Sequence, residues 1–382
     1  MSQIKQPIRV AIVGVGNCCS ALYQGIHYYK NLPTKQYIPG IMYQDIGGYQ
    51  PKDIKVVAAF DIDQRKVGKP LGQAIFESPN CSRIFHADVE DGPIVEMAPI
   101  MDGCSQEILD APLQYGFRID SRTPKDPVEF LINKNVDILI NYLPVGSENA
   151  TRYWAEVCLK LGISFCNCIP VFIASDPDWS QKFANARLPL IGDDIRSQFG
   201  ASIISQVLQE LAFDRGALVN CHQQINIGGN SDFLNMMNTE RLTSKKISKE
   251  NVIQATHEIH STTIKEESIF AGPSTWVPYL KDNKVAHFHL ELEGFGGAPI
   301  EFDAKLSVCD SENSAGVVID AIRYLKVAKE MGVGGALKGP SAWTQKTPPK
   351  QLPYSIARAE CASLAVRDEK ALRAAGNIIE NI

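Results

Sequence analysis

The sequence of 382 residues contains no run of about 18 consecutive apolar residues, the length that a membrane-spanning helix needs. Residues 1–7 are polar and lead directly into an apolar segment, without the cleavage site of a signal peptide. Basic residues are not in excess, because 38 Lys and Arg face 43 Asp and Glu and give a net charge of −5. Nucleic-acid and anionic-membrane binders carry a basic excess, so we expect no nucleic-acid and no membrane partner.

The ten cysteines form no Cys-x-x-Cys pair, which argues against a zinc ribbon or a thioredoxin-type site. Without a secretion signal, we expect reduced thiols that pack as small buried residues in a cytoplasmic protein. The sequence also has no Gly-x-Ser-x-Gly motif and no Walker phosphate loop.

The N-terminal half alternates short apolar runs with helical segments. The expected strands are 9–13, 55–60, 136–142, 163–168 and 188–191. A helix is expected at 18–29, and another after Ser147 as N-cap, ending near Gly162. Strands that alternate with helices pair in parallel, because a parallel connection needs a long crossover. The pattern predicts an α/β fold with a Rossmann-like, doubly wound parallel sheet.

The pattern changes after about Asp194 and predicts a second, mixed α+β domain. A helix is expected at 197–213, a strand at 219–227, and an antiparallel pair at 285–293 and 300–308. Apolar spacing predicts a returning helix at 314–331, and the tail at 356–375 is expected to be helical. Residues 31–53 and 79–127 are expected to be loops, the second long enough to contain an unassigned element.

A dinucleotide fingerprint follows the first expected strand. Gly14 permits a tight turn and Gly16 lets the backbone approach a pyrophosphate at the start of the helix, beside Asn17 and Cys18. Asp61 ends the second strand, where a carboxylate binds the adenosine ribose and repels a 2′-phosphate, so NAD is expected. Cys19 replaces the third glycine of the motif. The alternative is a purely structural turn.

Two further groups of residues have both a functional and a structural interpretation. Asp193 and Asp194 end a strand on the ligand side of the sheet, but they could equally cap the following helix. Lys245, Lys246 and Lys249 form a basic cluster that could bind a phosphate or supply a base, or could be a solvated face.

Two histidine pairs, His257 with His260 and His287 with His289, have spacings at which each pair could reach one metal ion. No matching Cys or carboxylate pattern surrounds them in the sequence. We therefore interpret all four as solvated or core residues.

The motifs together resemble the myo-inositol-1-phosphate synthase family, in its shorter bacterial form. The resemblance runs in order through nearly the whole chain. Its blocks are VAIVGVGN (10–17), NYLPVGSE (141–148), IPVFIASDP (169–177), GDDIRSQFGA (192–201), NIGGNSDFLNM (226–236), SKKISK (244–249), DNKVA (282–286), DSENSAGVVIDAIR (310–323) and QKTPPKQLP (345–353).

The resemblance implies an isomerase that converts glucose 6-phosphate to inositol 1-phosphate with tightly held NAD, for inositol and phospholipid biosynthesis. Oxidation at carbon 5 gives a ketone that acidifies carbon 6. The resulting enolate closes on the carbon 1 aldehyde, and reduction at carbon 5 completes the cycle. Such chemistry needs fixed positive charge at the phosphate and at the developing oxyanions.

The resemblance also assigns site residues. It implies catalytic roles for Lys245, Lys249, Lys284, Lys346, Asp194, Asp232 and Asp310, substrate contacts for Ser197 and Asn230, and cofactor contacts that include Asp193. Lys245 and Lys284 are the expected proton-transfer or oxyanion groups. Arg196 stands where the family commonly has lysine and keeps the charge, and the tail beyond Arg358 is longer than in the short bacterial form.

The expected organisation is an NAD-binding domain (1–200), a catalytic and tetramerisation domain (201–310) and a C-terminal return (311–382) in a homotetramer. Members of the family differ in using a divalent ion, a monovalent ion or none, so the metal is left open. A net NAD-dependent dehydrogenase of a sugar phosphate or semialdehyde is the main alternative, and a non-enzymatic NAD-binding regulator is a third.

Overall fold

The computed structural model describes residues 6–31, 37–237 and 253–374. Its larger sheet has seven strands, all paired in parallel, in the order β11-β6-β5-β4-β1-β2-β3. The strands are β1 (Ile8–Val13), β2 (Ile54–Asp61), β3 (Val95–Met97), β4 (Ile138–Asn141), β5 (Ser164–Asn167), β6 (Pro189–Ile191) and β11 (Gly335–Ala336). The order reverses between β1 and β4, which opens a ligand crevice at the carboxyl end of β1.

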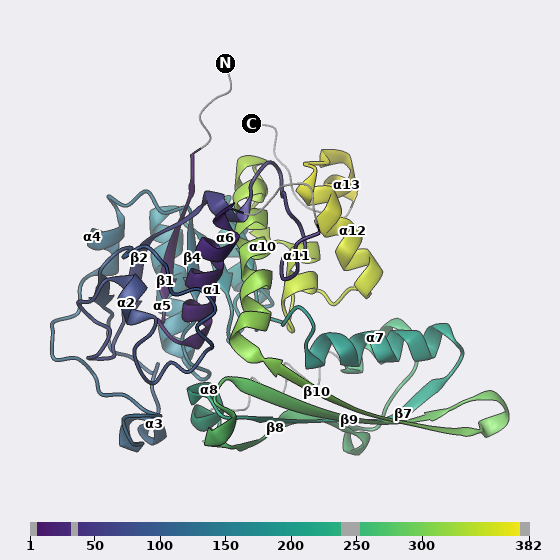
Figure 1. The fold of residues 1–382 in the computed structure, drawn as a ribbon. Helices are drawn as coiled ribbons and strands as arrows, with labels where there is room; N and C mark the ends of the chain where they lie inside the picture. The colour runs from purple at the N-terminus through teal and green to yellow at the C-terminus, as the bar shows by residue number, and fades with distance from the viewer. Residues whose placement is uncertain (1–5, 32–36, 238–252, 375–382) are drawn as a thin grey trace.

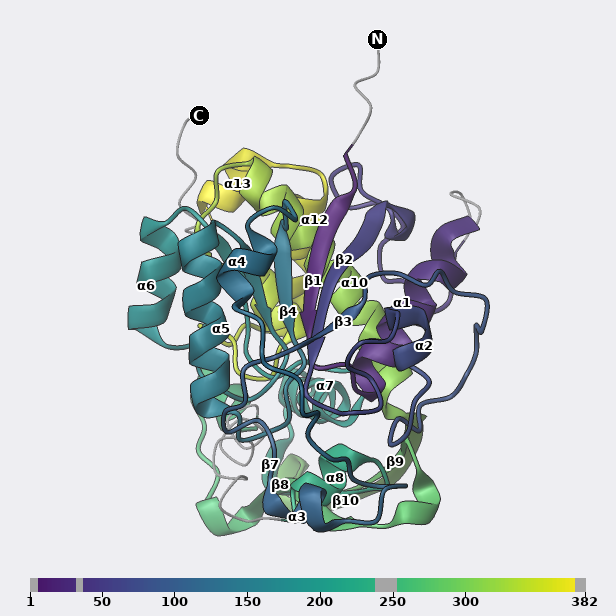
Figure 2. The same ribbon diagram turned by 90° about the vertical axis from the view of Figure 1, so that its left-hand side faces the viewer.

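Helices cover both faces of this sheet (Figure 2). Val10 and Ile12 of β1 pack toward α1 (Asn17–Tyr28) and α10 (Asp310–Glu330). Ala11 and Val13 lie in the opposite core with Trp154 of α5 (Glu148–Leu161), and α6 (Pro177–Asn185) covers the same face. Successive strand residues point to opposite faces, so an apolar run of this kind serves two cores. The doubly wound prediction is confirmed.

A second, mixed sheet has the order β10-β9-β7-β8. Its strands are β7 (Leu218–Gly228), β8 (Ile269–Trp276), β9 (Asn283–Glu293) and β10 (Pro299–Cys309). The predicted hairpin of β9 and β10 is confirmed as antiparallel. One face packs against α7 (Ala201–Asp214), where Ala286, Phe288 and Leu290 are buried, and the other face is open (Figure 1).

Residues 253–259 are helical, and the described part of the chain also contains several other α-helices. They are α2 (Leu71–Ala74), α3 (Gln106–Asp110), α4 (Pro127–Leu131), α8 (Ser231–Asn235), α11 (Lys338–Thr344), α12 (Tyr354–Ala365) and α13 (Glu369–Ala374). No helix among the described residues combines the length and apolar character that crossing a membrane needs.

Several predicted boundaries were wrong. The helix expected from Ser197 begins at Ala201, because backbone groups at Arg196 and Gln198 bind Thr344 and Asn313 of the C-terminal return instead. The segment 79–127, expected to be a loop long enough to contain an unassigned element, does contain such elements, the edge strand β3 and the helix α3. The tail forms two helices, since the chain turns at Arg367 with φ +57°.

The expected N-cap residue of α5 is confirmed, but its side chain does not bond to the helix. Ser147 occupies the N-cap position, but its hydroxyl donates to the carbonyl oxygen of Pro144. The Asp102 carboxylate caps the helix instead, accepting from the N–H groups of Asn149 and Ala150 at 2.7 and 2.9 Å. A long loop is therefore fixed at the start of α5, close to the ligand crevice.

Candidate active site

The turn between β1 and α1 has the form that a dinucleotide phosphate requires. Gly14 has φ +92°, and a Cβ atom there would lie 2.5 Å from the carbonyl oxygen of Tyr142. Gly16 lines the cavity, and a Cβ atom there would have no neighbour within 4 Å. No side chain caps α1, so the N–H groups of its first turn are available to an anion. These features fit the pyrophosphate of NAD.

Asp61 lies beside this turn at the end of β2. Its carboxylate accepts hydrogen bonds from the N–H groups of Val15 at 2.7 Å and Ile62 at 2.6 Å. These bonds tie β2 to the glycine turn while Asp61 still lines the cavity. At this position the Asp61 carboxylate can accept hydrogen bonds from ribose hydroxyls, and its negative charge would repel a 2′-phosphate.

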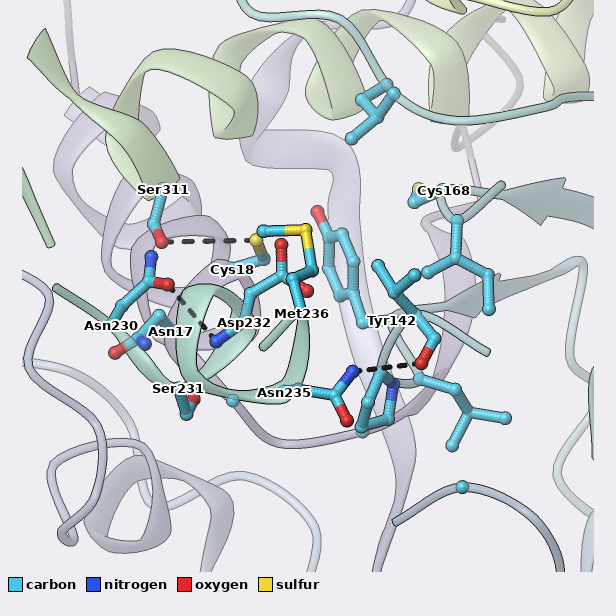
Figure 3. A pocket seen from close by; sticks show the side chains of 18 of the residues that line it. Asn17, Cys18, Tyr142, Cys168, Asn230, Ser231, Asp232, Asn235, Met236 and Ser311 are labelled. Carbon is cyan, nitrogen blue, oxygen red and sulfur yellow. Dashed lines mark hydrogen bonds between the residues drawn. The ribbon is translucent and has the colours of Figure 1, made fainter. Parts of the chain in front are cut away.

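Asn17 and Cys18 begin α1 and also line the cavity (Figure 3). The side-chain oxygen of Asn17 accepts from the N–H groups of Cys81 and Ser82, and so holds part of the 79–127 segment over the cofactor side. The Cys18 sulfur lies 3.9 Å from the Ser311 hydroxyl. Burial raises the pKa of the Cys18 thiol to about 12, so it remains a thiol at neutral pH.

Asp193 was expected to contact the cofactor, but the structure places it outside the cavity. It is fully buried and does not line the cavity. Its carboxylate accepts from the N–H groups of Ile173 and Ser175 at 3.0 Å and from the side chain of Asn167 at 2.8 Å. Both carboxylate oxygens of Asp193 are therefore used to hold the loop after β5. The sequence alone could not distinguish this structural role from a contact with the cofactor.

Two lysine–acid pairs line the same cavity from different parts of the chain. Lys284 of β9 pairs with Asp310, the first residue of α10. Lys346 donates to the Asp194 carboxylate at 2.7 Å, and its backbone N–H binds the carbonyl oxygen of Asp194 at 2.8 Å. Each lysine side chain is 15–17% exposed, so both charges sit in a partly desolvated space.

Three of the remaining predicted residues also reach the cavity. Ser197, Asn230 and Asp232 all line it. The Asn230 side chain caps α8, accepting from the N–H groups of Asp232 and Phe233 (Figure 3). Lys245 and Lys249 lie outside the described residues.

The cavity, of about 270 Å³, thus joins the glycine turn and Asp61 of the first sheet to polar groups of the second. Comparison with known proteins gives a consistent result. The sequence profile described as myo-inositol-1-phosphate synthase matches residues 200–311. Inositol-3-phosphate synthase of Mycobacterium tuberculosis is 46% identical over 354 residues, covering 92% of this chain and 94% of that protein.

The chain belongs to the myo-inositol-1-phosphate synthase family. Inositol-3-phosphate synthase of Corynebacterium glutamicum is 44% identical over 356 residues, covering 92% of this chain and 96% of that protein. Among solved structures, Ari2 is 30% identical with a TM-score of 0.74, covering 95% of this chain and 99% of that one. Inositol-3-phosphate synthase of Caenorhabditis elegans, 14% identical, has a TM-score of 0.73 over 95% of this chain and 86% of that one, and shows the fold alone.

Sequence reasoning missed Asp282. It is 4% exposed and accepts hydrogen bonds from the Asn230 side chain at 2.9 Å and from the Ser311 N–H and hydroxyl at 3.1 and 2.9 Å. Burial and the neighbouring Asp310 raise the pKa of Asp282 to about 7. The DNKVA block pointed to this segment, but the sequence could not show that Asp282 faces inward.

Tyr142 and Lys66 are further cavity residues that the sequence did not single out. The Tyr142 hydroxyl is buried without a hydrogen-bond partner in the described part of the chain, and it points into the cavity (Figure 3). Lys66 is 4% exposed and donates to Asn80 at 3.0 Å. Both offer a polar group that a bound ligand can satisfy.

Proposed function

We propose that this family member is the NAD-dependent isomerase that converts D-glucose 6-phosphate to 1L-myo-inositol 1-phosphate. The observation that supports the proposal is the single cavity in which a dinucleotide-type turn meets two lysine–acid pairs. A reaction that only transfers a hydride needs the first feature. Cyclisation of an open-chain sugar phosphate also needs the second, because negative charge develops at several oxygens.

The residues proposed to hold NAD are Gly14, Gly16, Asn17, Cys18 and Asp61, which fit its pyrophosphate and ribose. When bound, NAD supplies reversible hydride transfer at one sugar carbon. The chain itself supplies the fixed charges around that carbon.

Lys284 and Lys346 are proposed to stabilise oxyanions and to move protons. Each ammonium is held by one carboxylate, so its position and charge are set before substrate arrives. Asp310 and Asp194 are the orienting acids. Lys245 and Lys249, with Ser197, Asn230 and Asp232, complete the proposed substrate site.

A homotetramer is the proposed assembly, built on the second sheet. Strand β10 is an 11-residue edge strand, and edges of this length are normally covered. Large apolar side chains are exposed on the same domain: Val207, Leu211, Ile300 and Phe302 are 39%, 55%, 46% and 38% exposed. The free cysteines support a reducing location, and we propose the cytoplasm.

Product identification tests the function. The protein is incubated with glucose 6-phosphate and NAD, and the product is identified by phosphorus and carbon NMR. The expected result is inositol 1-phosphate without net NADH. Stoichiometric free NADH with no cyclic product would replace the proposal with the net dehydrogenase. Repeating the assay after chelation, with Mg²⁺, Zn²⁺ or NH₄⁺ restored singly, determines the cation requirement.

A further inference from the structure

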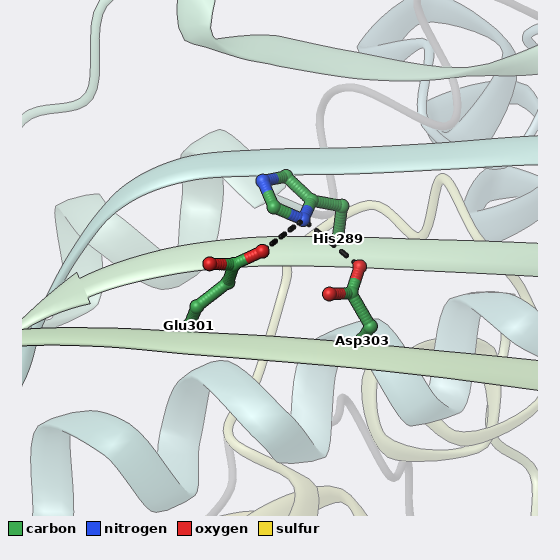
Figure 4. A group of neighbouring side chains, drawn as sticks. All are labelled: His289, Glu301 and Asp303. Atoms are coloured by element: carbon green, nitrogen blue, oxygen red, sulfur yellow. Dashed lines mark hydrogen bonds and ion pairs between the residues drawn. The ribbon is translucent and has the colours of Figure 1, made fainter.

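The open face of the second sheet carries a group of ionisable side chains, three of which are drawn in Figure 4, and none of these three lines the cavity of the candidate active site. In the register of β9 and β10, His289 lies opposite Asp303, and Glu291 lies opposite Glu301. These odd-numbered residues point away from α7, whereas Phe288 and Leu290 point toward it. Lys284 of the cavity is five residues earlier on β9 and on the other face.

The two nitrogens of the His289 ring face different carboxylates. Nδ1 lies 2.9 Å from Asp303 and 3.9 Å from Glu301, and both carboxylates are on the same side of the ring. Nε2 lies 3.4 Å from Glu291. One ligand atom from each of His289, Glu301 and Asp303 lies within 4.8 Å of the other two.

The charge of this group is unbalanced. Three carboxylates surround one imidazole, which contributes one positive charge at most. Among the described residues, no Lys or Arg forms an ion pair with Glu291, Glu301 or Asp303. A cation placed between Nδ1 and the two nearest carboxylates would offset this excess.

We propose that His289, Asp303 and Glu301 bind a divalent transition-metal ion of the Zn²⁺ type through Nδ1 and one oxygen of each carboxylate. Zn²⁺ takes nitrogen and carboxylate ligands at about 2.0–2.2 Å, which sets ligand–ligand separations of about 3.3 Å in a tetrahedron. The distances from Nδ1 of His289 to the oxygens of Asp303 and Glu301, 2.9 and 3.9 Å, lie on either side of that value. Small side-chain rotations would therefore bring the three ligand atoms to the separations that the ion requires. Water completes the coordination.

Glu291 has the position of an orienting partner. A histidine that binds metal through one nitrogen commonly donates its other N–H to a carboxylate, which fixes the tautomer and the ring orientation. Glu291 accepts from Nε2 in this arrangement and leaves the Nδ1 lone pair facing the ion. The competing arrangement is an imidazolium that binds all three acids with no metal.

The test is calorimetric titration of the metal-stripped full-length protein with Zn²⁺ alone. We expect one class of binding that His289→Ala and Asp303→Asn each weaken at least tenfold, and that Glu291→Gln weakens about tenfold to a hundredfold. His287→Ala is the matched control, since His287 is on the same face but opposite Lys305. Circular dichroism confirms that each variant is folded.

Anomalous diffraction at the zinc edge of soaked crystals locates the ion. A peak between His289 and Asp303 supports the proposal. No Zn²⁺ binding by the unmutated protein, binding that His289→Ala leaves unchanged, or binding that His287→Ala removes to the same extent would each overturn it.

Discussion

At the scale of single residues, Lys284 and its partner Asp310 carry the clearest chemical prediction. Lys284→Ala should lower product formation by about two orders of magnitude or more, the loss that follows removal of one oxyanion or proton-transfer group. The measurement is the initial rate of inositol phosphate formation. Lys305→Ala is the control, because this lysine is on β10 but on the open face of the sheet.

The same variant identifies the step that Lys284 serves. If it acts after the first oxidation, enzyme-bound NADH accumulates on mixing with glucose 6-phosphate and is seen by absorbance. If it acts in the first oxidation, no such signal appears. If the rate of inositol phosphate formation is unchanged in Lys284→Ala, Lys284 is not a catalytic residue.

Asp61 carries a prediction about the cofactor. Asp61→Asn keeps a side-chain oxygen that can accept from Val15 but removes the charge that we propose binds the ribose. NAD affinity should fall about tenfold to a hundredfold, since hydrogen bonds to a charged group contribute about 1.5–3 kcal/mol. Calorimetric titration with NAD measures the change, and equal affinities would contradict the proposed fingerprint.

Asp282 carries a prediction about pH. Its pKa is about 7 in the folded protein and near 3.8 when unfolded, so the folded protein holds an additional proton between these values. The contribution of Asp282 to the free energy of unfolding should therefore fall as pH rises from about 4 to about 7, by up to about 1.4 kcal/mol per unit, and then level off. Buried Asp193 and Asp320, with pKa values raised to about 6, act in the same direction, whereas His222 and His257, whose pKa values burial lowers to about 4, act in the opposite direction.

Asp282→Asn removes one of these titrating groups. Relative to the unmutated protein, the thermal midpoint of this variant should be lower at pH 4, and the difference should shrink as pH rises to 7. Identical pH profiles would show that Asp282 does not titrate in this range.

Single residues also show what the sequence could and could not predict. Gly14, Gly16 and Asp61, which line the cavity, could be singled out from the sequence because the glycine turn depends on neighbours in the chain, a strand before and a helix after. The His289 cluster was missed, since its carboxylates come from the facing strand and only the β9–β10 register brings them together. Asp102 at the start of α5 was missed for the same reason.

At the scale of elements, α10 links separate parts of the chain. Arg323 of this helix is fully buried, pairs with Asp320 and donates to the carbonyl oxygens of Tyr43, Gln44 and Tyr49. It therefore holds the 43–49 segment of the expected 31–53 loop against the core. The sequence predicted α10 from its apolar spacing but treated 31–53 only as an insertion.

Removing this arginine should destabilise the protein. Arg323→Met removes the charge that pairs with the buried Asp320 carboxylate and the donor to three carbonyl oxygens, at a cost of about 3–5 kcal/mol. Thermal unfolding should show a clearly lower midpoint. Arg83→Met is the control, because the exposed ion pair of Arg83 with Glu312 of α10 contributes about 0–1 kcal/mol. Similar midpoints for the two variants would refute the role of Arg323.

Element boundaries were predicted less well than the elements themselves. The segment before α7 has enough helical character to suggest a start at Ser197. Its backbone groups instead bond to residues about 115–150 positions later, at Asn313 and Thr344. Apolar spacing carries no information about such long-range partners, so the helix begins at Ala201.

At the scale of the whole molecule, the prediction concerns assembly. Light scattering at micromolar concentration should give the mass of a tetramer, and Leu211→Glu should reduce that mass by placing a charge on the exposed side of α7. Tyr37→Glu, an exposed aromatic outside the second domain, is the control. A monomeric mass with full activity would exclude the tetramer.

The chain passes between the two sheets twice, once in the segment before α7 and once at Asp310, where β10 continues into α10 without a loop. A domain joined to another by two short connections can rotate only about the line that joins the two connections. Here one connection is the end of the 21-residue helix α10, which packs into the core of the first domain. Opening of the crevice is therefore restricted to rotation about this line. We expect NAD to exchange slowly compared with turnover and to remain with the protein through purification, as suits a cofactor that is restored in every cycle.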